Sequence, residues 1–234
     1  MLEKDLNMKE AQSIIEKALE EGRTSLSEYE SKNLLRLYGI PVTREILVKD
    51  HGEFLKAAAE IGYPLVIKAC SPEVTHKTER NLVRVDIRNA EEAGSAFTDL
   101  MSRMEGKSKT LLVQEMVRGS RELVVGMTRD PQFGPCVMFG LGGIYTEILK
   151  DVSFRVAPLE KRDALQMMQE IRGHKILESV RGMPPADMEL LCPILIKVGE
   201  IGLENGAIKE IDVNPLILSG NKPVAVDALV VLSA

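Results

Sequence analysis

Hydrophobic and polar positions along the chain change period several times, and each change marks a new element. Residues 8–21 and 27–39 carry apolar side chains three and four positions apart, which is the spacing of one helix face, and a glycine closes each run. Ser27 followed by Glu30 forms a capping box, the sequence signature of a helix start. The chain is therefore predicted to open with two helices.

The remaining pattern alternates between strands and helices. Short apolar or alternating runs predict strands, and runs of helical period predict helices. The predicted strands are 45–50, 64–70, 82–87, 111–117, 121–130 and 136–142, followed by a closing hairpin of 207–218 and 223–232. The predicted helices are 51–64, 89–104, 161–171 and 185–204.

This order of elements predicts an α+β fold with two lobes. The first lobe reads βαββα, for which we expect a mixed sheet, and the second repeats the mixture of strands and helices. We expect an N-terminal helix and linker at 1–25, an N-terminal lobe at 26–112 and a C-terminal lobe at 113–234. No fixed repeat period supports a solenoid.

Composition limits the possible functions. The chain has 234 residues, 44% hydrophobic and 28% charged, which is typical of a globular protein. Its net charge of −5 argues against a nucleic-acid-binding surface, because such surfaces concentrate Lys and Arg. No apolar run predicts a signal peptide or a membrane span, so we expect a cytoplasmic protein.

Lys68 and a glycine-rich turn are candidates for contact with phosphates. Lys68 interrupts the apolar run 65–69, so it must either reach solvent or meet an anion. Gly142 and Gly143 follow a predicted strand, where glycines let backbone N–H groups approach a phosphate. An exposed strand lysine and a hairpin turn are the plainer interpretations. The spacing fits neither a Rossmann nor a P-loop motif.

The segment that follows the strand 111–117 suits a hinge between two lobes. Backbone groups near Met116 and Val117 could read the edge of an adenine, and a carboxylate such as Glu115 or Glu122 could accept ribose hydroxyls. A solvated turn explains the same residues more simply.

Polar residues alternate along the predicted strand 207–218. Glu210, Asp212 and Asn214 share one face because strand side chains alternate, and Asp227 comes from the paired strand. Carboxylate and amide oxygens suit Mg²⁺, which completes its octahedron with phosphates and water. The sequence predicts a magnesium site here, with a polar outer sheet face as the alternative.

His76 is one of three histidines and lies in a polar stretch shortly after Lys68. A lone histidine is more often a surface residue than a catalyst. However, its position downstream of a lysine that is a candidate for phosphate contact makes phosphoryl chemistry a reasonable hypothesis.

Four stretches of the chain resemble the ATP-grasp subunit of the ADP-forming acyl-CoA synthetases, the acetate-producing branch of the succinyl-CoA synthetase superfamily. The resemblance runs from about residue 26 to the end, and TRDPQFGP and EIDVNPL are its most specific motifs. The four stretches are YESKNLLRLYGIPV, YPLVIKACSPEVTHKTE, RELVVGMTRDPQFGPCVMFGLGGIYTEILKD and IKEIDVNPLIL.

The resemblance implies an ATP-grasp fold, Mg²⁺ as cofactor and ADP or ATP as substrate nucleotide. It implies that Lys68 contacts the nucleotide phosphates. Glu115 and the backbone around Met116 and Val117 would form the adenine hinge, and Glu122 would bind the ribose.

The resemblance also implies the metal ligands and the catalytic group. Asn214 and Asp227 would bind Mg²⁺, with Asp212 nearby. His76 would receive a phosphoryl group from a histidine of a partner subunit and transfer it to ADP. One departure from the family pattern is Asn81-Leu82, where relatives commonly have Gly-Gly, so the loop lacks residues that would make it pliable.

The complete reaction, acyl-CoA + ADP + phosphate = carboxylate + ATP + CoA, needs a CoA-binding part that the 234 residues do not show. We therefore expect a CoA-binding alpha subunit and an alpha2beta2 heterotetramer. The helix 8–21 could clasp that partner or simply pack on its own lobe. Two alternatives stay open: a free-standing ATP-grasp carboxylate–amine ligase, and an inactive nucleotide-binding regulatory subunit.

Overall fold

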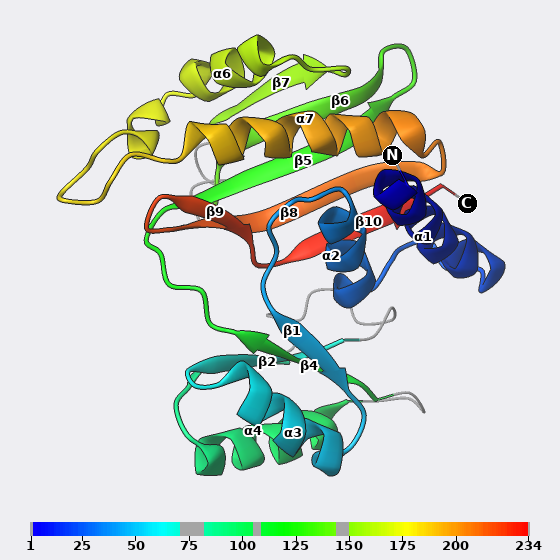
Figure 1. The fold of residues 1–234 in the computed structure, drawn as a ribbon, viewed down its shortest axis with the longest axis vertical. Coiled ribbons are helices and arrows are strands. Elements are labelled where there is room, and N and C mark those ends of the chain that lie inside the picture. Colours follow the sequence, from blue (N-terminus) through cyan, green and yellow to red (C-terminus); the bar gives the residue numbers. More distant parts are fainter. Residues whose placement is uncertain (1, 71–81, 105–108, 144–149, 234) are drawn as a thin grey trace. The chain divides into compact units, whose positions relative to one another are not determined.

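The computed structural model describes the chain except for residues 1, 71–81, 105–108, 144–149 and 234, and describes residues 2–4 only as backbone. The described part forms two compact units, each with its own sheet and helices (Figure 1). Unit 1 comprises Met1–Leu26, Glu30–Val42 and Arg118–Ala234. Unit 2 comprises Ser27–Tyr29 and Thr43–Val117.

Unit 2 is a four-stranded sheet with two helices. Its elements are β1 (Glu45–Val48), α3 (His51–Ile61), β2 (Leu65–Ala69), β3 (Val83–Ile87), α4 (Ala90–Arg103) and β4 (Leu111–Glu115). The strand order is β1-β4-β2-β3, and each of these pairings is antiparallel. The expectation of a mixed sheet is therefore wrong. The chain enters β4 through α4 rather than directly from β3, which lets β4 lie between β1 and β2.

Local sequence explains the two helices of unit 2. Asp50 and Asn89 precede α3 and α4, and their side chains accept hydrogen bonds from the backbone N–H of Glu53 and Glu92, both at 2.9 Å. Both helices pack against the same sheet, α3 on β1 and β4 and α4 on β2 and β3.

Unit 1 is built around a six-stranded antiparallel sheet with the order β10-β8-β5-β6-β7, in which β9 also pairs with β8. Its strands are β5 (Glu122–Asp130), β6 (Gly134–Leu141), β7 (Val152–Val156), β8 (Ile208–Ser219), β9 (Lys222–Ala225) and β10 (Ala228–Leu232). Its helices are α1 (Leu2–Glu20), most of α2 (Glu28–Leu37), α6 (Lys161–Glu170), the 3₁₀ turn η1 (His174–Leu177) and α7 (Met188–Glu204).

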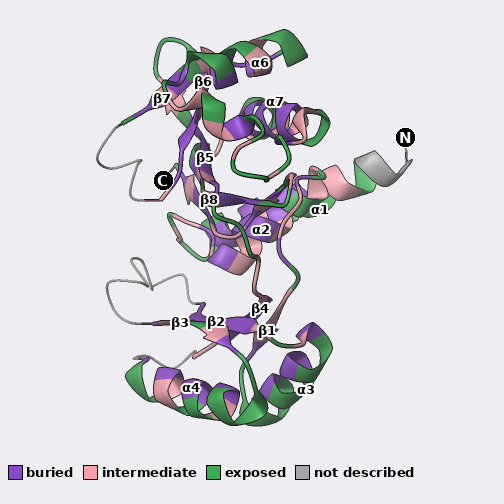
Figure 2. Ribbon diagram, turned by 90° about the vertical axis from the view of Figure 1, so that its left-hand side faces the viewer, coloured by how far each residue is buried: buried purple, intermediate pink, exposed green. Residues whose placement is uncertain are grey.

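One face of this sheet is covered by α6 and α7, as Figure 1 shows. Buried residues run through β5 and β8 in Figure 2, and they make up five of the nine residues of β5 and six of the twelve of β8, which agrees with the inner position of both strands in the sheet. Arg129 fixes the end of α7, since its guanidinium donates to the carbonyl oxygens of Gly202 at 2.6 Å and Asn205 at 3.0 Å. These hydrogen bonds satisfy groups at the end of the helix that have no partner within it.

The N-terminal helix packs into unit 1. Ala11, Ile15 and Ala18 are buried in the same apolar cluster as Leu26 and Leu34. Their spacing of three and four residues places them on one face of α1. This contact supports the interpretation of 8–21 as a helix that packs on its own lobe. The two units divide the chain at other positions than the expected boundaries near residues 25 and 112.

Two differences from the expected elements have clear causes. The predicted helix 185–204 begins only at Met188, because the carboxylate of Asp187 caps it by accepting hydrogen bonds from the N–H groups of Glu189 and Leu190. The predicted strand 223–232 is two strands, because the chain leaves the β9 pairing at Val226 and Asp227 before β10 begins. Within the described residues, no helix is both long and apolar enough to cross a bilayer.

Candidate functional site

The lysine predicted to contact phosphate is buried rather than exposed. Lys68 lies on β2, which has β3 on one side and β4 on the other, so it sits inside the sheet of unit 2. Its Nζ is 2.7 Å from Oε1 of Glu28, and the two side chains are 7% and 1% exposed. The exposed-lysine alternative is therefore wrong. Lys68 does meet an anion, and in this structure the anion is a carboxylate of the same chain.

Glu28 is a residue that the sequence analysis missed. It lies in the first turn of α2, 40 positions before Lys68. A Glu beside the capping residue Ser27 looks like an ordinary helix-start residue, because acidic side chains favour that position. Only the fold shows that this carboxylate balances a buried ammonium.

The predicted adenine hinge lies at the end of unit 2. β4 ends at Glu115, and the last segment of unit 1 begins at Arg118. The carboxylate of Glu115 accepts hydrogen bonds from the backbone N–H of Arg44 at 2.8 Å and from its Nε at 2.9 Å. The backbone N–H of Met116 donates to the Pro64 oxygen at 3.4 Å. The carboxylate of Glu115 thus holds Arg44.

The two candidate glycines stand against the start of β5. The backbone N–H of Gly142 donates to the Glu122 oxygen at 2.8 Å, and a Cβ on Gly142 would lie 2.7 Å from the Leu123 oxygen. Gly143 has a φ of +64°, and a Cβ there would lie 2.5 Å from Oε2 of Glu122. The close approach that requires glycine is therefore to β5, and it brings Glu122 beside Gly142 and Gly143 as one group.

The three candidate metal ligands also form one group, with Asp212 and Asn214 on β8 and Asp227 just before β10. The backbone N–H of Asn214 donates to the Asp227 oxygen at 3.2 Å, so the two segments are joined directly. Asp212 pairs with Leu229 of β10 and is half-buried, while Asn214 is exposed. On β8 the polar residues alternate with the buried Val213, as the sequence pattern predicted.

Electrostatics distinguish this group from a plain polar sheet face. Burial, together with the nearby carboxylates of Glu210 and Asp227, raises the pKa of Asp212 to about 6. Within the described part of the chain, no three His, Cys, Asp or Glu side chains are arranged to hold a metal by themselves. A hard cation could still bind through carboxylate and amide oxygens if phosphates and water completed its coordination. The donor set therefore fits Mg²⁺ held jointly with a nucleotide.

His76 and Asn81 lie outside the described residues. The described chain stops at Cys70 and resumes at Leu82, and both of these residues are anchored. The N–H of Cys70 donates to the Thr110 oxygen, and the Leu82 oxygen accepts from the N–H of Ala69, both at 2.9 Å. Leu82 is only 5% exposed.

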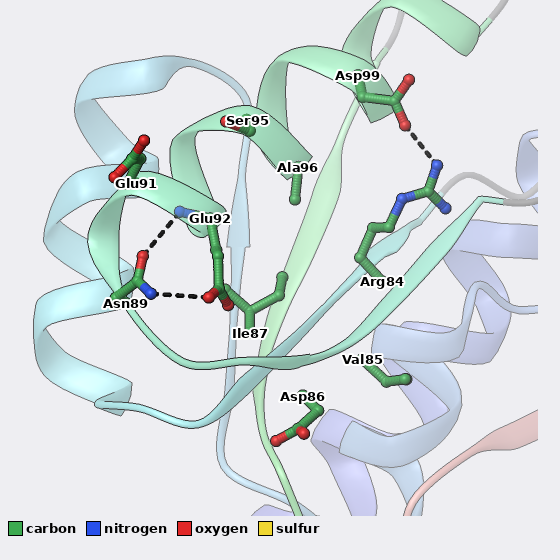
Figure 3. Close-up of a pocket in the computed structure, with 10 residues that line it drawn as sticks. All are labelled: Arg84, Val85, Asp86, Ile87, Asn89, Glu91, Glu92, Ser95, Ala96 and Asp99. Carbon is green, nitrogen blue, oxygen red and sulfur yellow. Dashed lines mark hydrogen bonds and ion pairs between the residues drawn. The ribbon is translucent and has the colours of Figure 1, made fainter.

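Two pockets in the described part of the chain are lined by none of the predicted site residues. A pocket of about 640 Å³ lies beside β3 and α4 in unit 2 (Figure 3). In it Arg84 pairs with Asp99, and Asn89 is hydrogen-bonded to Glu92. These pairs stabilise the helix and the edge strand, so the pocket has a structural explanation. A smaller pocket of about 350 Å³ in unit 1, lined by Met168, His174 and neighbours, also contains none of the predicted residues.

Comparison with known proteins gives three results. Residues 17–232 match the family model of the ATP-grasp domain. The beta subunit of acetate–CoA ligase (ADP-forming) I from Pyrococcus furiosus is 47% identical over 227 residues, covering 95% of this chain and 97% of that protein. Acetate–CoA ligase (ADP-forming) I from Archaeoglobus fulgidus is 38% identical over 236 residues, but this match covers 99% of this chain and 34% of that longer protein.

Solved structures of the Ca. Korarchaeum cryptofilum acetyl-coenzyme A synthetase 1 have the same fold over 95% of this chain and 100% of theirs. One, with coenzyme A and Ca-AMPCP, has 42% sequence identity and a TM-score of 0.91. Another, with acetyl-coenzyme A and a phosphorylated phosphohistidine segment, has 41% identity and a TM-score of 0.87. A third, with Mg-AMPPCP and that segment pointing towards the nucleotide binding site, has 42% identity and a TM-score of 0.85.

The fold and these matches define an ATP-grasp protein, which confirms the α+β class and the resemblance drawn from the sequence. Within that class, the chain belongs to the family of beta subunits of the ADP-forming acetate–CoA ligases.

Proposed function

We propose that this chain is the nucleotide-binding subunit of an ADP-forming acyl-CoA synthetase and passes a phosphoryl group to ADP through His76. The observation that carries the proposal is similarity over nearly the whole length of a named beta subunit. The buried Lys68 and the clustered oxygens of Asp212, Asn214 and Asp227 support it, because they match the phosphate and metal contacts that nucleotide chemistry needs.

Two displacement steps at phosphorus describe the chemistry. A ring nitrogen of His76 attacks the phosphorus of a phosphorylated donor on the partner, so that a P–N bond forms as the donor's bond breaks. A terminal oxygen of ADP then attacks the same phosphorus, the P–N bond breaks, and ATP forms. An imidazole suits this relay because it is neutral and nucleophilic near neutral pH, and its phosphoramidate is reactive.

The described residues would bind and position the nucleotide. Lys68 would place its ammonium against the phosphates, and backbone groups at Met116 and Val117 would contact the adenine. Glu122, next to Gly142 and Gly143, would accept the ribose hydroxyls. Positioning and charge stabilisation are most of what phosphoryl transfer requires of a protein.

Asn214 and Asp227 would hold Mg²⁺, with Asp212 beside them. The ion would neutralise phosphate charge that builds up during transfer. The raised pKa of Asp212 supports this assignment, because crowded carboxylates of this kind are relieved by a cation.

The acyl-CoA chemistry would reside on a CoA-binding alpha subunit, in an assembly such as an alpha2beta2 heterotetramer. The Archaeoglobus fulgidus protein supports this division, since this chain matches only 34% of it and the rest has room for a further part. Copurification with the product of a neighbouring gene is the direct measurement of the partner and of the stoichiometry.

Labelling with [γ-³²P]ATP and Mg²⁺ in the presence of the partner tests the relay. The wild-type chain should carry an acid-labile, base-stable label, because phosphoramidates hydrolyse in acid whereas phosphoserine survives it. His76→Ala should abolish the label and still bind ADP, since the nucleotide contacts do not include the imidazole.

His51→Ala and His174→Ala are the matched controls, and both should label like the wild type. Label that persists in His76→Ala, or disappears in either control instead, contradicts the assignment of His76. A wild-type complex that couples a carboxylate to an amine without any histidine label would favour the free-standing ligase. A complex that binds ADP but forms neither label nor ATP would favour the inactive regulatory subunit.

A further inference from the structure

Lys32 is a second buried lysine, and neither the sequence motifs nor the proposed chemistry accounts for it. It lies in the middle of α2 and is 0% exposed. Lysine is almost never fully buried unless its ammonium meets a partner, because removing the charge from water is costly. Its Nζ donates to the backbone oxygen of Val226 at 3.2 Å.

Val226 and Asp227 form the short connection between β9 and β10. Backbone hydrogen bonds fix the connection on the side of β8: the N–H of Val226 donates to the Pro215 oxygen at 3.0 Å, and the N–H of Asn214 donates to the Asp227 oxygen at 3.2 Å. Lys32 acts on the remaining polar group of Val226, its carbonyl oxygen. That carbonyl belongs to the peptide that joins Val226 to Asp227, so its orientation sets the direction in which the Asp227 side chain leaves the backbone.

We propose that Lys32 is a positioning residue for the metal site: its ammonium holds the Val226–Asp227 peptide so that the Asp227 carboxylate stays aligned with Asn214. The inference rests on the proposed function, in which Asp227 and Asn214 bind Mg²⁺. A hydrogen bond from a charged donor is stronger than one between neutral groups, which suits it to holding a peptide beside mutually repelling carboxylates. Mg²⁺ makes this precision necessary, because it demands near-ideal octahedral geometry.

Ser31, the preceding residue on α2, provides a matched control. It is also 0% exposed, and its Oγ accepts a hydrogen bond from the N–H of Val230 at 3.1 Å. Val230 lies on β10 beyond Asp227. Ser31→Ala therefore weakens the contact between the same helix and the same part of the sheet, but it leaves the Val226–Asp227 peptide untouched. A purely structural role for Lys32 predicts that the two substitutions behave alike.

The experiment compares Lys32→Met with Ser31→Ala in the full chain. Binding of Mn²⁺, as a paramagnetic substitute for Mg²⁺, is measured by electron paramagnetic resonance with ADP present, and ADP binding is measured separately in EDTA. Lys32→Met should weaken Mn²⁺ binding roughly tenfold, the size expected when a group that orients a ligand is lost. Ser31→Ala should change it less than about twofold, and neither variant should alter ADP binding in EDTA. Thermal unfolding is recorded for both, since both should lower the melting temperature.

Three outcomes overturn the inference: unchanged Mn²⁺ affinity in Lys32→Met, an equal loss in Ser31→Ala, or a loss of ADP binding in EDTA that accompanies the loss of Mn²⁺. If Lys32→Met does not fold, Lys32→Gln is used instead, because the glutamine amide can still donate a hydrogen bond but carries no charge. Mn²⁺ binding by Lys32→Gln that is no weaker than Mn²⁺ binding by Ser31→Ala then contradicts the proposal. Asp227→Ala separates this failure from that of the proposed function. Unchanged Mn²⁺ binding in Asp227→Ala would rule out the proposed metal site itself. Weaker Mn²⁺ binding in Asp227→Ala but not in Lys32→Met would rule out only the role of Lys32.

Discussion

The charge of Lys68, the predicted phosphate contact in unit 2, is neutralised within the chain, whereas the charges of the predicted metal ligands in unit 1 repel one another. Lys68 is buried against Glu28, so its charge is balanced by the chain itself. Asp212 lies near Glu210 and Asp227, and burial with these like charges raises its pKa to about 6. The first group is stable as it stands, while the second would gain from a cation supplied from outside. This difference indicates that the lysine is preorganised and that the carboxylates are arranged for a ligand.

Lys68→Met is expected to have the largest effect on stability, because it leaves the Glu28 carboxylate buried beside an apolar side chain. Removing one partner of a buried ion pair typically lowers the free energy of unfolding by about 3 to 5 kcal/mol. Denaturant titration of the nucleotide-free chain measures the change. The double variant Glu28→Gln with Lys68→Met should recover more than half of the loss, since neither charge of this pair then remains buried. A loss below about 1 kcal/mol in the single variant would show that the pair is not balanced as described.

Sequence patterns identified some residues of these two groups but not the residues that they contact. Lys68 was recognised because it interrupts an apolar strand, and Asp212 because it shares a strand face with Glu210 and Asn214. Glu28 and Lys32 were not recognised, since their partners lie 40 and 194 positions away and a helix-start Glu or a helical Lys is ordinary. The period of the sequence pattern indicates which face of a helix or strand a residue occupies. It does not indicate which distant residues pack against that face in the fold.

The strand β7 was missed for a related reason. Its alternation runs opposite to the usual pattern: Phe154 and Val156 are exposed, while the polar Ser153 is buried and donates to the Met167 oxygen at 2.8 Å. The run VSFRV does alternate apolar and polar residues as a strand should, but it is only five residues long, and alternation alone would place its apolar side chains on the wrong face. The motif residues were easier to find, because a family pattern identifies residues whose burial and spacing are unremarkable, such as Asn214.

Asp227→Ala should have the next largest effect, and it acts on the cation rather than on the fold. Loss of an anionic ligand should raise the Mg²⁺ concentration needed for half-maximal ATP formation by roughly a hundredfold. The titration is run with the partner subunit present. Glu210→Gln is the matched control, since it removes a neighbouring exposed carboxylate that is not a predicted ligand, and it should shift the requirement less than about threefold. If Asp227→Ala needs the same Mg²⁺ concentration as the wild type, Asp227 is not a ligand of the metal.

Asp212→Asn should have the smallest effect, and its sign is opposite to that of Lys68→Met. In the metal-free chain at neutral pH, a carboxylate held near two others costs stability, so replacing it with a neutral amide should raise the free energy of unfolding. One pKa unit corresponds to about 1.4 kcal/mol, and because Asp212 is partly exposed we expect a gain of about 1 to 2 kcal/mol. Denaturant titration in EDTA measures it, with Glu210→Gln expected to stay within about 0.5 kcal/mol of the wild type. Mg²⁺ with ADP should then stabilise the wild type more than Asp212→Asn, because the cation relieves a repulsion that the variant lacks. If Asp212→Asn is less stable than the wild type in EDTA, the carboxylate is satisfied within the chain, and the contrast with the Lys68–Glu28 pair does not hold.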